Sequence, residues 1–539
     1  MTRLAQWFDA VVLDLGRQLR WSFLPPLMVY FAYGASGLTS VVGTFFVKEY
    51  LDVSAAFLAG LAFWAGLPWA LKMPMGHLVD LLWRFKWVLV FVGAGLISLS
   101  LLIMYGLSVR LPWMADLMTP TAWYVLATLL APTGFVVQDA VADALSVEAV
   151  PRVDDTGTPY QPETLRAMHT TMQTLGRFAL IGALAFVAAL NISLFAGVED
   201  LSEQAKAATY GRIYLIGLCI PVISISGVLL AMVQQARKRA RLIASGLSPE
   251  QARAHLTPGD GATKPNWWYF FGGGVFLVMT LTVGLSNVPH SQEIVFAGSL
   301  TIVLILMRQL IQNLSPQAAR TLIGTAIIVF MFRAVPLPGA GATWFTIDML
   351  GFDQQFLSVL SLVGSLLTLV GMLVLRPFMA NHTMASIVIW LSLAAGVLSL
   401  PNIALYYGVQ NWTAAMTGGI VDARFIALID TAMESPLGQV AMIPMLAWIA
   451  RNAPDGLKAT FFAVMASFTN LALSASNLAT KYLNQIFTVT REVTAADGST
   501  TPADYGQLGA LLITVALITV ILPLVTVLIV QNSNLRSVD

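Results

Sequence analysis

Charged side chains are scarce in this sequence, and their scarcity decides its broad class. Only 11% of the 539 residues are Asp, Glu, Lys or Arg, whereas 57% are hydrophobic. An ordinary soluble domain carries about 25% charged residues, so we exclude a soluble protein and predict a chain that crosses the bilayer many times. The formal net charge of +1 gives no general attraction to nucleic acid, and no nucleic-acid partner is expected.

Groups that hold metals or perform covalent chemistry are also sparse. The single cysteine, Cys219, excludes an internal disulfide, and the five histidines are scattered along the chain. Neither a phosphate-binding P-loop nor an HExxH zinc motif occurs in the sequence. We therefore predict no metal site, no cofactor and no enzymatic activity.

Long apolar segments make up most of the sequence. A spanning helix needs about 20 mostly apolar residues, and by that length the sequence predicts about fourteen helices in an all-α polytopic membrane protein. The expected helices are Leu24–Val47, Ala55–Met75, Trp87–Leu107, Ala122–Val147, Ala167–Phe195, Ile213–Val233, Trp268–Asn287, Ile294–Met307, Leu322–Pro336, Phe356–Leu375, Met384–Tyr407, Ile420–Ala450, Leu457–Phe487 and Leu508–Val530. Among these, Ile294–Met307 is short for a spanning helix.

Polar stretches divide the expected helices into groups. The leader at 1–22 has an apolar stripe that suits an amphipathic helix on the cytoplasmic membrane surface, or it is a short polar leader without a role. A six-helix bundle is expected at 23–233 and a cytoplasmic linker at 234–266. An inserted helix pair at 267–316 then precedes a second six-helix bundle at 317–539.

The positions of Lys and Arg predict the orientation of the helices. If the N-terminus is cytoplasmic, the cations gather in the inner loops, for example at Arg237, Lys238 and Arg241, and few occur in outer loops, such as Lys48 and Arg491. This is the positive-inside pattern. It predicts a multi-pass protein of the cell (inner or cytoplasmic) membrane with both termini in the cytoplasm.

Two carboxylates stand on one stripe of the fourth expected helix. Asp139 and Asp143 are four residues apart, and at about 3.6 residues per turn this spacing places both on one face. A carboxylate inside a bilayer costs about 2.5–3.5 kcal/mol on insertion scales. The pair is therefore expected to face a protein interior or a water-filled cavity, and it is a candidate functional site.

The second half of the chain repeats this arrangement. Its fourth expected helix carries Asp430 and Glu434, again four residues apart. The helix after each acid pair carries a lone cation, Arg177 in the first half and Lys481 in the second. Weak internal symmetry of this kind is typical of transporters built from two related bundles, although chance repetition is an alternative.

The loop after the second expected helix carries Lys72, Gly76, Asp80 and Arg84. It resembles the corresponding inner loop of major facilitator superfamily transporters. The resemblance implies a gating loop, in which Gly76 lets helix ends approach and Asp80 forms a breakable charge latch with the cations. The alternative is an ordinary basic inner loop.

Further motifs resemble one family of that superfamily, the folate–biopterin transporters. They are Asp139-x-x-x-Asp143-Ala-x-x-x-Glu148, Phe332-Arg333-Ala-Val-Pro336, Asp348-Met-Leu-Gly-Phe352, Asp422-Ala-Arg-Phe425 and Asn452-Ala-Pro-Asp-Gly456. The resemblance covers most of both halves and implies a proton-coupled carrier of folates, pterins or similar conjugated metabolites. The inserted helix pair departs from the usual twelve-helix members, and a fourteen-helix plan also resembles bacterial muropeptide permeases.

Group chemistry suggests roles for the ionisable residues. Arg177 and Arg333 offer planar forks of donors that suit an anionic substrate tail. Asp139, Asp430 and Glu434 are candidates for pterin recognition, for proton coupling, or for both, because burial favours the protonated form of a carboxylate. The alternative is structural, in which ionisable groups pair with one another and hold helices together, namely Asp430, Glu434, Arg177, Arg333 and Lys481.

Other polar residues leave two interpretations open. Gln439 and Asn470 either line the substrate path or form hydrogen bonds between helices. Asp143 is expected to anchor the inner end of its helix through Arg152 or Arg166.

The sequence thus predicts a major facilitator fold of two six-helix bundles and an inserted helix pair, working by alternating access. The predicted partners are a folate- or pterin-like small molecule, a proton and the lipid bilayer, and a monomer is expected. A muropeptide or other organic-anion permease is the second reading. A non-transporting membrane assembly factor is the third, and substrate counterflow in vesicles distinguishes it from a carrier.

Overall fold

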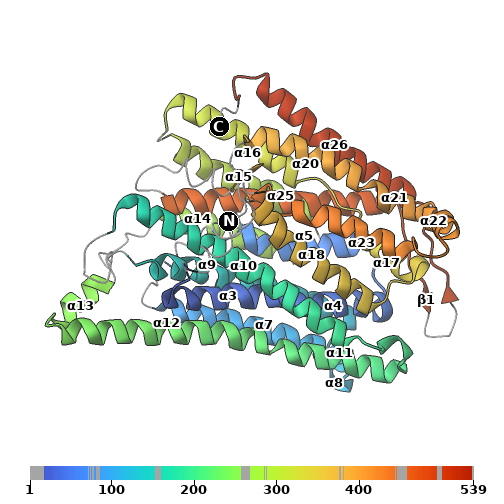
Figure 1. Ribbon diagram of the computed structural model, residues 1–539, viewed down its shortest axis with the longest axis horizontal. Coiled ribbons are helices and arrows are strands. Elements are labelled where there is room, and N and C mark those ends of the chain that lie inside the picture. The colour runs from blue at the N-terminus through green and yellow to red at the C-terminus, as the bar shows by residue number, and fades with distance from the viewer. Residues whose placement is uncertain are drawn as a thin grey trace, which may run out of the picture.

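A computed structural model describes residues 17, 19–70, 72, 75, 78–79, 85–151, 160–256, 267–284, 286, 288–312, 314–375, 378–379, 382–442, 445, 458–494 and 500–536. In this part of the chain the fold is all-α apart from one small hairpin. The long helices run side by side along one axis of the molecule (Figure 1). The first half occupies the lower part of this view and the second half the upper part.

The first half contains six long helical segments with short helices between them. Their bounds are η2 Trp21–Phe23, α3 Leu24–Ala35, η3 Ser36–Thr39, α4 Ser40–Tyr50, α5 Ala55–Ala70, α7 Lys86–Ser108, α8 Pro112–Leu117, α9 Pro120–Ala149, α10 Pro162–Leu194, η5 Val198–Asp200, α11 Glu203–Gly217, α12 Cys219–Ala244 and α13 Pro249–Leu256. Several starts follow local rules. Thr119, for example, caps α9 by accepting a hydrogen bond from the Ala122 amide, and proline follows at the first helical position.

The second half follows the helix pair α14 and α15. The bounds are α14 Trp267–Gly284, α15 Ser291–Ile311, α16 Pro316–Arg333, α17 Ala340–Leu350, α18 Gln354–Val374, α20 Met384–Leu398, α21 Leu400–Tyr406, α22 Val409–Thr417, α23 Ala423–Glu434, η6 Ser435–Leu437, α25 Lys458–Ile486, β1 Val493–Thr494, β2 Thr500–Thr501 and α26 Leu508–Gln531. The two strands pair antiparallel, with Val493 opposite Thr501.

Each half has its own apolar core. Phe45, Ile97 and Ile213 belong to the core of the first half, and Leu322 and Phe468 belong to that of the second. The two halves contact each other through two pairs of helices: α5 packs along α25, and α10 packs along α18. The fold is therefore two bundles joined through two pairs of helices.

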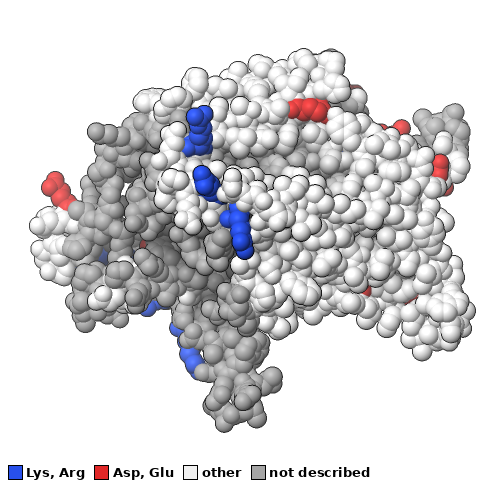
Figure 2. All heavy atoms as spheres, turned by 90° about the horizontal axis from the view of Figure 1, so that it is seen from above, with Lys and Arg blue, Asp and Glu red and all other residues white. Residues whose placement is uncertain are grey.

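The molecule is built to cross a bilayer. Within the described residues, nine helices are long and apolar enough to span a membrane, and Ala55–Ala70 and Phe271–Gly284 are shorter apolar helices. Figure 2 shows the molecule from above the view of Figure 1. The surface seen there carries almost no charged side chains between a short row of Lys and Arg and a few Asp and Glu. This is a multi-pass membrane protein, and the arrangement is consistent with the expected fourteen helices.

Several bounds differ from those expected. The sixth long helix continues to Ala244, so the first part of the stretch 234–266 is helical, and α13 follows within it. Helix α15 has 21 residues, longer than expected. The short helix α17 was not expected; glycines with positive φ, Gly339 and Gly351, flank it at its two ends. The leader at 1–22 lies largely outside the described residues.

Candidate functional site

A partly buried ionic cluster joins α3, α9 and the chain just after α5. The Lys72 Nζ lies 2.5 Å from Asp139 Oδ2 and 2.7 Å from Asp143 Oδ2. The Tyr30 hydroxyl donates a hydrogen bond to Asp143 Oδ1 at 2.7 Å. One ammonium group therefore contacts two carboxylates, and one face of α9 presents both acids, as their spacing predicts.

The described partner of Asp143 is Lys72, which we did not predict. The expected partners, Arg152 and the side chain of Arg166, lie outside the described residues, so that pairing stays a prediction. The other residues of the expected gating loop, Gly76, Asp80 and Arg84, also lie outside them. Within the described structure, Lys72 is thus part of the acid cluster.

Arg177 lies on α10 close to this cluster. It interacts electrostatically with Asp139 and with Tyr33 of α3. Within the described part of the chain, no ion pair or hydrogen bond of the Arg177 side chain is present. Its positive charge is therefore near an acid that Lys72 already pairs.

Arg333 is the last residue of α16, in the second half. Its Nη1 lies 3.4 Å from the thioether sulfur of Met442, a weak acceptor, and its Nε is buried without a hydrogen-bond partner among the described residues. Electrostatic repulsion from Arg177 reaches it across the two halves. Two cations from opposite halves thus interact electrostatically, and neither forms an ion pair with a carboxylate among the described residues.

The acid pair of the second half has different surroundings. The Asn402 amide of α21 donates to Asp430 Oδ2 at 2.8 Å, and Asp430 Oδ1 is buried without a partner in the described structure. Glu434, one turn further along α23, repels Asp430 electrostatically. Among the described residues, no lysine pairs with these two acids as Lys72 does with Asp139 and Asp143.

Lys481, the lone cation of the second half, contacts residues of the inserted helix pair rather than Asp430 or Glu434. Its Nζ lies 3.2 Å from Glu293 Oε1 and donates to Gln292 Oε1 at 2.8 Å, and Tyr482 also donates to Glu293. The expectation that the lone cations of the two halves are equivalent is therefore not met by their contacts. Lys481 connects α25 to α15, whereas Arg177 lies near the acid cluster.

The two expected lining residues have different roles in the structure. The Asn470 amide donates to the Trp69 carbonyl at 3.3 Å, a hydrogen bond between α25 and α5 that favours the helix-packing alternative. Gln439 has a buried Oε1 without a partner among the described residues, so it has an acceptor left for a ligand. Tyr33 packs against Trp69 and Phe135, with 5.4 Å between ring centroids in each pair.

A second polar network joins the halves at the end of the molecule that carries β1 and β2, which we call the hairpin end (Figure 1). Lys48 Nζ lies 2.5 Å from Asp348 Oδ1, and the Tyr505 hydroxyl donates to Asp348 Oδ2 at 2.5 Å. Arg491 donates to the carbonyls of Lys48 and Leu51. These contacts, the hairpin-end network, hold the end of α4 against α17 and the hairpin. The sequence signals Asp348 only as part of a family motif.

Burial shapes the electrostatics of this network. Burial lowers the pKa of the Arg491 guanidinium, and the nearby carboxylates of Asp52 and Asp348 partly offset this decrease. It also raises the pKa of the Tyr505 phenol, and the hydrogen bond to Asp348 raises that pKa further. Tyr505 therefore stays a neutral donor to Asp348 at physiological pH.

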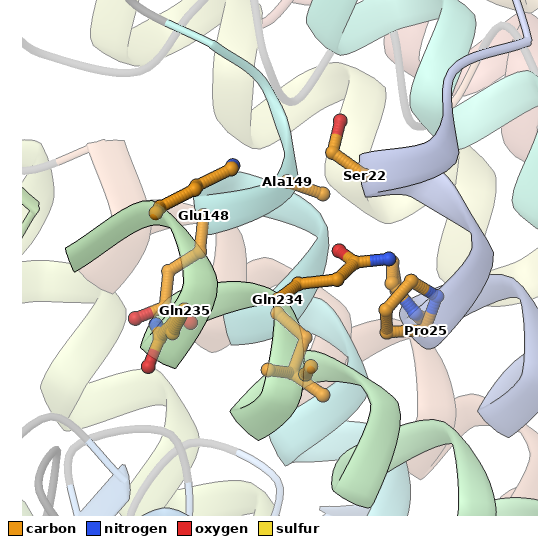
Figure 3. A pocket seen from close by; sticks show the side chains of 10 residues that line it. Ser22, Pro25, Glu148, Ala149, Gln234 and Gln235 are labelled. Carbon is orange, nitrogen blue, oxygen red and sulfur yellow. The ribbon is translucent and has the colours of Figure 1, made fainter. Parts of the chain in front are cut away.

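A small cavity at the opposite end is too small for an organic substrate. It lies between the start of α3, the end of α9 and α12, with Ser22, Pro25, Glu148 and Gln234 at its wall (Figure 3). Its volume is about 40 Å³, whereas ligand pockets usually measure roughly 300–1,000 Å³. The arginines and the acid cluster remain the candidate site.

Sequence comparison connects the chain to transporters. The model of the BT1 family matches residues 164–539. The "Folate-biopterin transporter" of Synechocystis sp. is 22% identical over 460 residues, which cover 85% of this chain and 74% of that protein. The "Folate transporter 2" of Plasmodium falciparum is 23% identical over 155 residues, which cover 28% of this chain and 31% of that protein.

Solved structures share the fold. A nucleoside transporter, NupG, aligns with a TM-score of 0.56 at 10% identity, over 94% of this chain and 99% of that one. A POT family transporter solved with 5-aminolevulinic acid aligns with a TM-score of 0.58 at 10% identity, over 97% and 96% of the two chains. At such low identity the likeness shows the architecture alone, which is the major facilitator fold that the sequence predicts.

Proposed function

The chain belongs to the BT1 family of membrane transporters, and on this premise we propose that it carries a folate- or pterin-like organic anion by alternating access coupled to protons. Relatives named as folate and folate-biopterin transporters support the substrate class. The two-bundle fold supports the mechanism, because a site between two bundles can be exposed to each side in turn when they rock.

The observation that carries the proposal is the pair Arg177 and Arg333. They come from opposite halves, they repel each other, and neither has an acidic partner of its own in the described structure. A guanidinium withdrawn from water without a counter-ion is costly. An anion held between the two arginines would remove the repulsion and supply the missing acceptors.

The geometry of a guanidinium suits the carboxylates of a folate-like tail. Its planar fork matches a carboxylate with two parallel hydrogen bonds. Each hydrogen bond to a charged group contributes about 1.5–3 kcal/mol. The bound anion would contact both halves, so binding and the movement of the bundles would be linked.

We assign proton coupling to the cluster of Lys72, Asp139 and Asp143. Two carboxylates share one ammonium group at 2.5 and 2.7 Å, so the cluster carries a net negative charge when both acids are ionised. Like charges at one site favour protonation of one member. Arg177 lies next to Asp139, and an anion on Arg177 would weaken its electrostatic support of that carboxylate and favour proton uptake.

Orientation and assembly follow from the same proposal. The hairpin end faces outward and both termini are cytoplasmic, as the distribution of Lys and Arg favours. The hairpin-end network then closes the outer side, with the gating loop of Lys72, Gly76, Asp80 and Arg84 on the inner side. A monomer in the cytoplasmic membrane is sufficient, because each chain carries both halves of the site.

A binding screen of the purified protein tests the substrate class. Folates, pterins and anhydromuropeptides are titrated against the wild type, Arg333→Gln and Arg320→Gln. Arg320 is an exposed cation near the start of the same helix, so its variant is the matched control. We expect folate or pterin binding that weakens by about tenfold or more in Arg333→Gln, because a charge-assisted hydrogen bond is lost.

The remaining outcomes are equally informative. Binding of anhydromuropeptides but not of folates or pterins would replace the proposed substrate class by the muropeptide reading. Equal affinities in the wild type and Arg333→Gln, with either substrate, would contradict the assignment of the arginines. Folded variants are verified by size-exclusion chromatography in detergent.

A further inference from the structure

The helix expected at Ile420–Ala450, the twelfth of the fourteen, is broken after Glu434 in the structure. Helix α23 begins at Ala423 and ends at Glu434, and the 3-10 turn η6 and further turns follow. At about 1.5 Å per residue, the break lies roughly 18 Å from the start of α23, within a hydrocarbon core about 30 Å thick. The sequence supplies the cause, because Pro436 has no amide hydrogen to continue the helix.

Two carboxylates stand at this break. Asp430 is only 7% exposed, and its Oδ1 is buried without a hydrogen-bond partner in the described part of the chain. Its Oδ2 accepts from Asn402 at 2.8 Å. Glu434 is one turn further along α23 and repels Asp430 electrostatically. Because Glu434 is exposed, the two carboxylates can be reached from the protein surface on its side.

No basic side chain faces the pair from the helices packed against it. Helices α18, α20 and α21 and the turn η6 pack on α23. Their sequences contain no Lys, Arg, His, Asp or Glu, and Tyr406, which donates to the Tyr505 and Gly506 carbonyls, is the one titratable group on them. Among the described helices that pack on α23, the two carboxylates therefore find no counter-ion of the kind that Lys72 supplies to the pair in the first half.

The backbone adds negative potential at the same point. The C-terminal end of a helix carries a partial negative charge and free carbonyl groups, and α23 ends at Glu434 itself. The turn is held in place rather than loose, since Thr368 of α18 donates to the Ser435 carbonyl at 3.0 Å. A Cβ atom at Gly371 of α18 would collide with the backbone of Pro436. Half-helix C-termini of this kind bind Na⁺ or protons in other carriers.

We propose that the break at Asp430 and Glu434 is a binding site for a small monovalent cation, separate from the anion site on Arg177 and Arg333. The carboxylates, the Asn402 side-chain oxygen and the carbonyls at the end of α23 are its oxygen ligands. Sodium and the proton share the chemistry that this site recognises, a single positive charge bound through oxygen. The inference goes beyond the proposed function and concerns the protein without substrate.

Thermal unfolding of the full-length protein in detergent, without any organic substrate, tests the site. Sodium chloride replaces choline chloride at constant ionic strength, and separately the pH is changed between about 5 and about 8. A bound cation raises the Tm as its concentration rises above Kd, by roughly 1 °C per tenfold for a protein of this size. We expect this rise in the wild type, with sodium or with protons.

The variants locate the effect. Asp430→Asn and Glu434→Gln are expected to lose the cation-dependent rise. Asp422→Asn is the matched control, because it removes one charge from the same helix and asparagine still caps it. Asp422→Asn should behave as the wild type. Asn402→Asp adds a third carboxylate and should shift the response to about tenfold lower cation concentration, and this keeps the test valid if Asp430→Asn does not fold.

The contrast between the salts identifies the ion. A response to sodium at constant pH assigns Na⁺, and a response to pH alone assigns the proton; both support the site. A wild type whose Tm responds to neither, or equal responses in the wild type, Glu434→Gln and Asn402→Asp, would overturn it. Loss of folate binding in Arg333→Gln is a separate measurement, so failure here does not decide the proposed function.

Discussion

At the scale of single residues, the ionisable groups at hydrocarbon depth fall into three environments. Asp139 and Asp143 share Lys72, Asp430 and Glu434 have an amide but no described cation, and neither arginine forms an ion pair with an acid among the described residues. A charge in a bilayer is tolerated only with a partner or a function. On our proposals, the three environments would bind a proton, a small cation and an organic anion, respectively.

Neutralising Asp139 tests the proton site. In Asp139→Asn the cluster keeps one carboxylate for Lys72 and has no excess charge to attract a proton. We expect uptake driven by a proton gradient to fall to background while the protein remains in the membrane. The measurement is uptake of labelled substrate into vesicles with and without an imposed pH gradient.

Asp116→Asn is the control for this experiment. It removes an exposed acid of α8, in the same half but outside the cluster, and should leave uptake unchanged. Proton-dependent uptake in Asp139→Asn at the wild-type level would contradict the assignment.

Sequence reasoning predicts the residues of the acid cluster better than their partners. The four-residue spacing places Asp139 and Asp143 on one face, and the structure confirms this through Lys72. The identity of Lys72 as the partner depends on how the chain after α5 packs against α9, which helical periodicity does not contain. Met442 beside Arg333 and Asn402 beside Asp430 were missed for the same reason.

At the scale of elements, the inserted helix pair lies on the line where α5 meets α25. Gln292 at the start of α15 donates to the Gly60 carbonyl of α5 and accepts from Lys481 of α25. Val295 of α15 shares an apolar cluster with residues of both helices. The pair therefore supports the contact between the two halves on this side of the molecule.

Removing the cation of this contact tests its contribution. Lys481→Met leaves the partly buried Glu293 without its ion pair and breaks the hydrogen bond to Gln292. We expect the free energy of unfolding to fall by about 1–3 kcal/mol, because the partly buried Glu293 loses a charged donor and keeps the hydrogen bond from Tyr482. A lower Tm in detergent measures the loss.

His290→Gln provides the comparison. His290 is 74% exposed and 3.9 Å from Glu293, so its replacement should leave the Tm within experimental error of the wild type. If Lys481→Met unfolds at the wild-type temperature, the inserted pair does not stabilise the contact between α5 and α25 through this cation.

Two element boundaries were predicted wrongly although local signals mark them. We expected one helix over Ile420–Ala450, but α23 ends at Glu434, just before Pro436. We expected no helix at α17, which Gly339 and Gly351 flank. Hydropathy alone shows neither boundary. The place of α14 and α15 against α5 and α25 was not predictable, because it depends on contacts between helices more than two hundred residues apart.

At the scale of the whole molecule, the hairpin-end network joins the two halves. Lys48 and Leu51 of the first half contact Asp348 and Arg491 of the second. Any motion that opens this end must break the ion pair of Lys48 and the hydrogen bonds of Arg491 together. The network therefore favours a molecule closed at the hairpin end, and the arginine pair Arg177 and Arg333 brings charge from both halves to the proposed substrate site.

Counterflow in vesicles tests this account most directly. Purified protein is reconstituted into vesicles loaded with unlabelled folate or pterin, and entry of the labelled compound is followed without any ion gradient. The account predicts transient accumulation with the wild type and with Arg320→Gln, and none with Arg333→Gln or Arg177→Gln. Absence of counterflow with the wild type, or the same counterflow after both arginines are replaced, would contradict it.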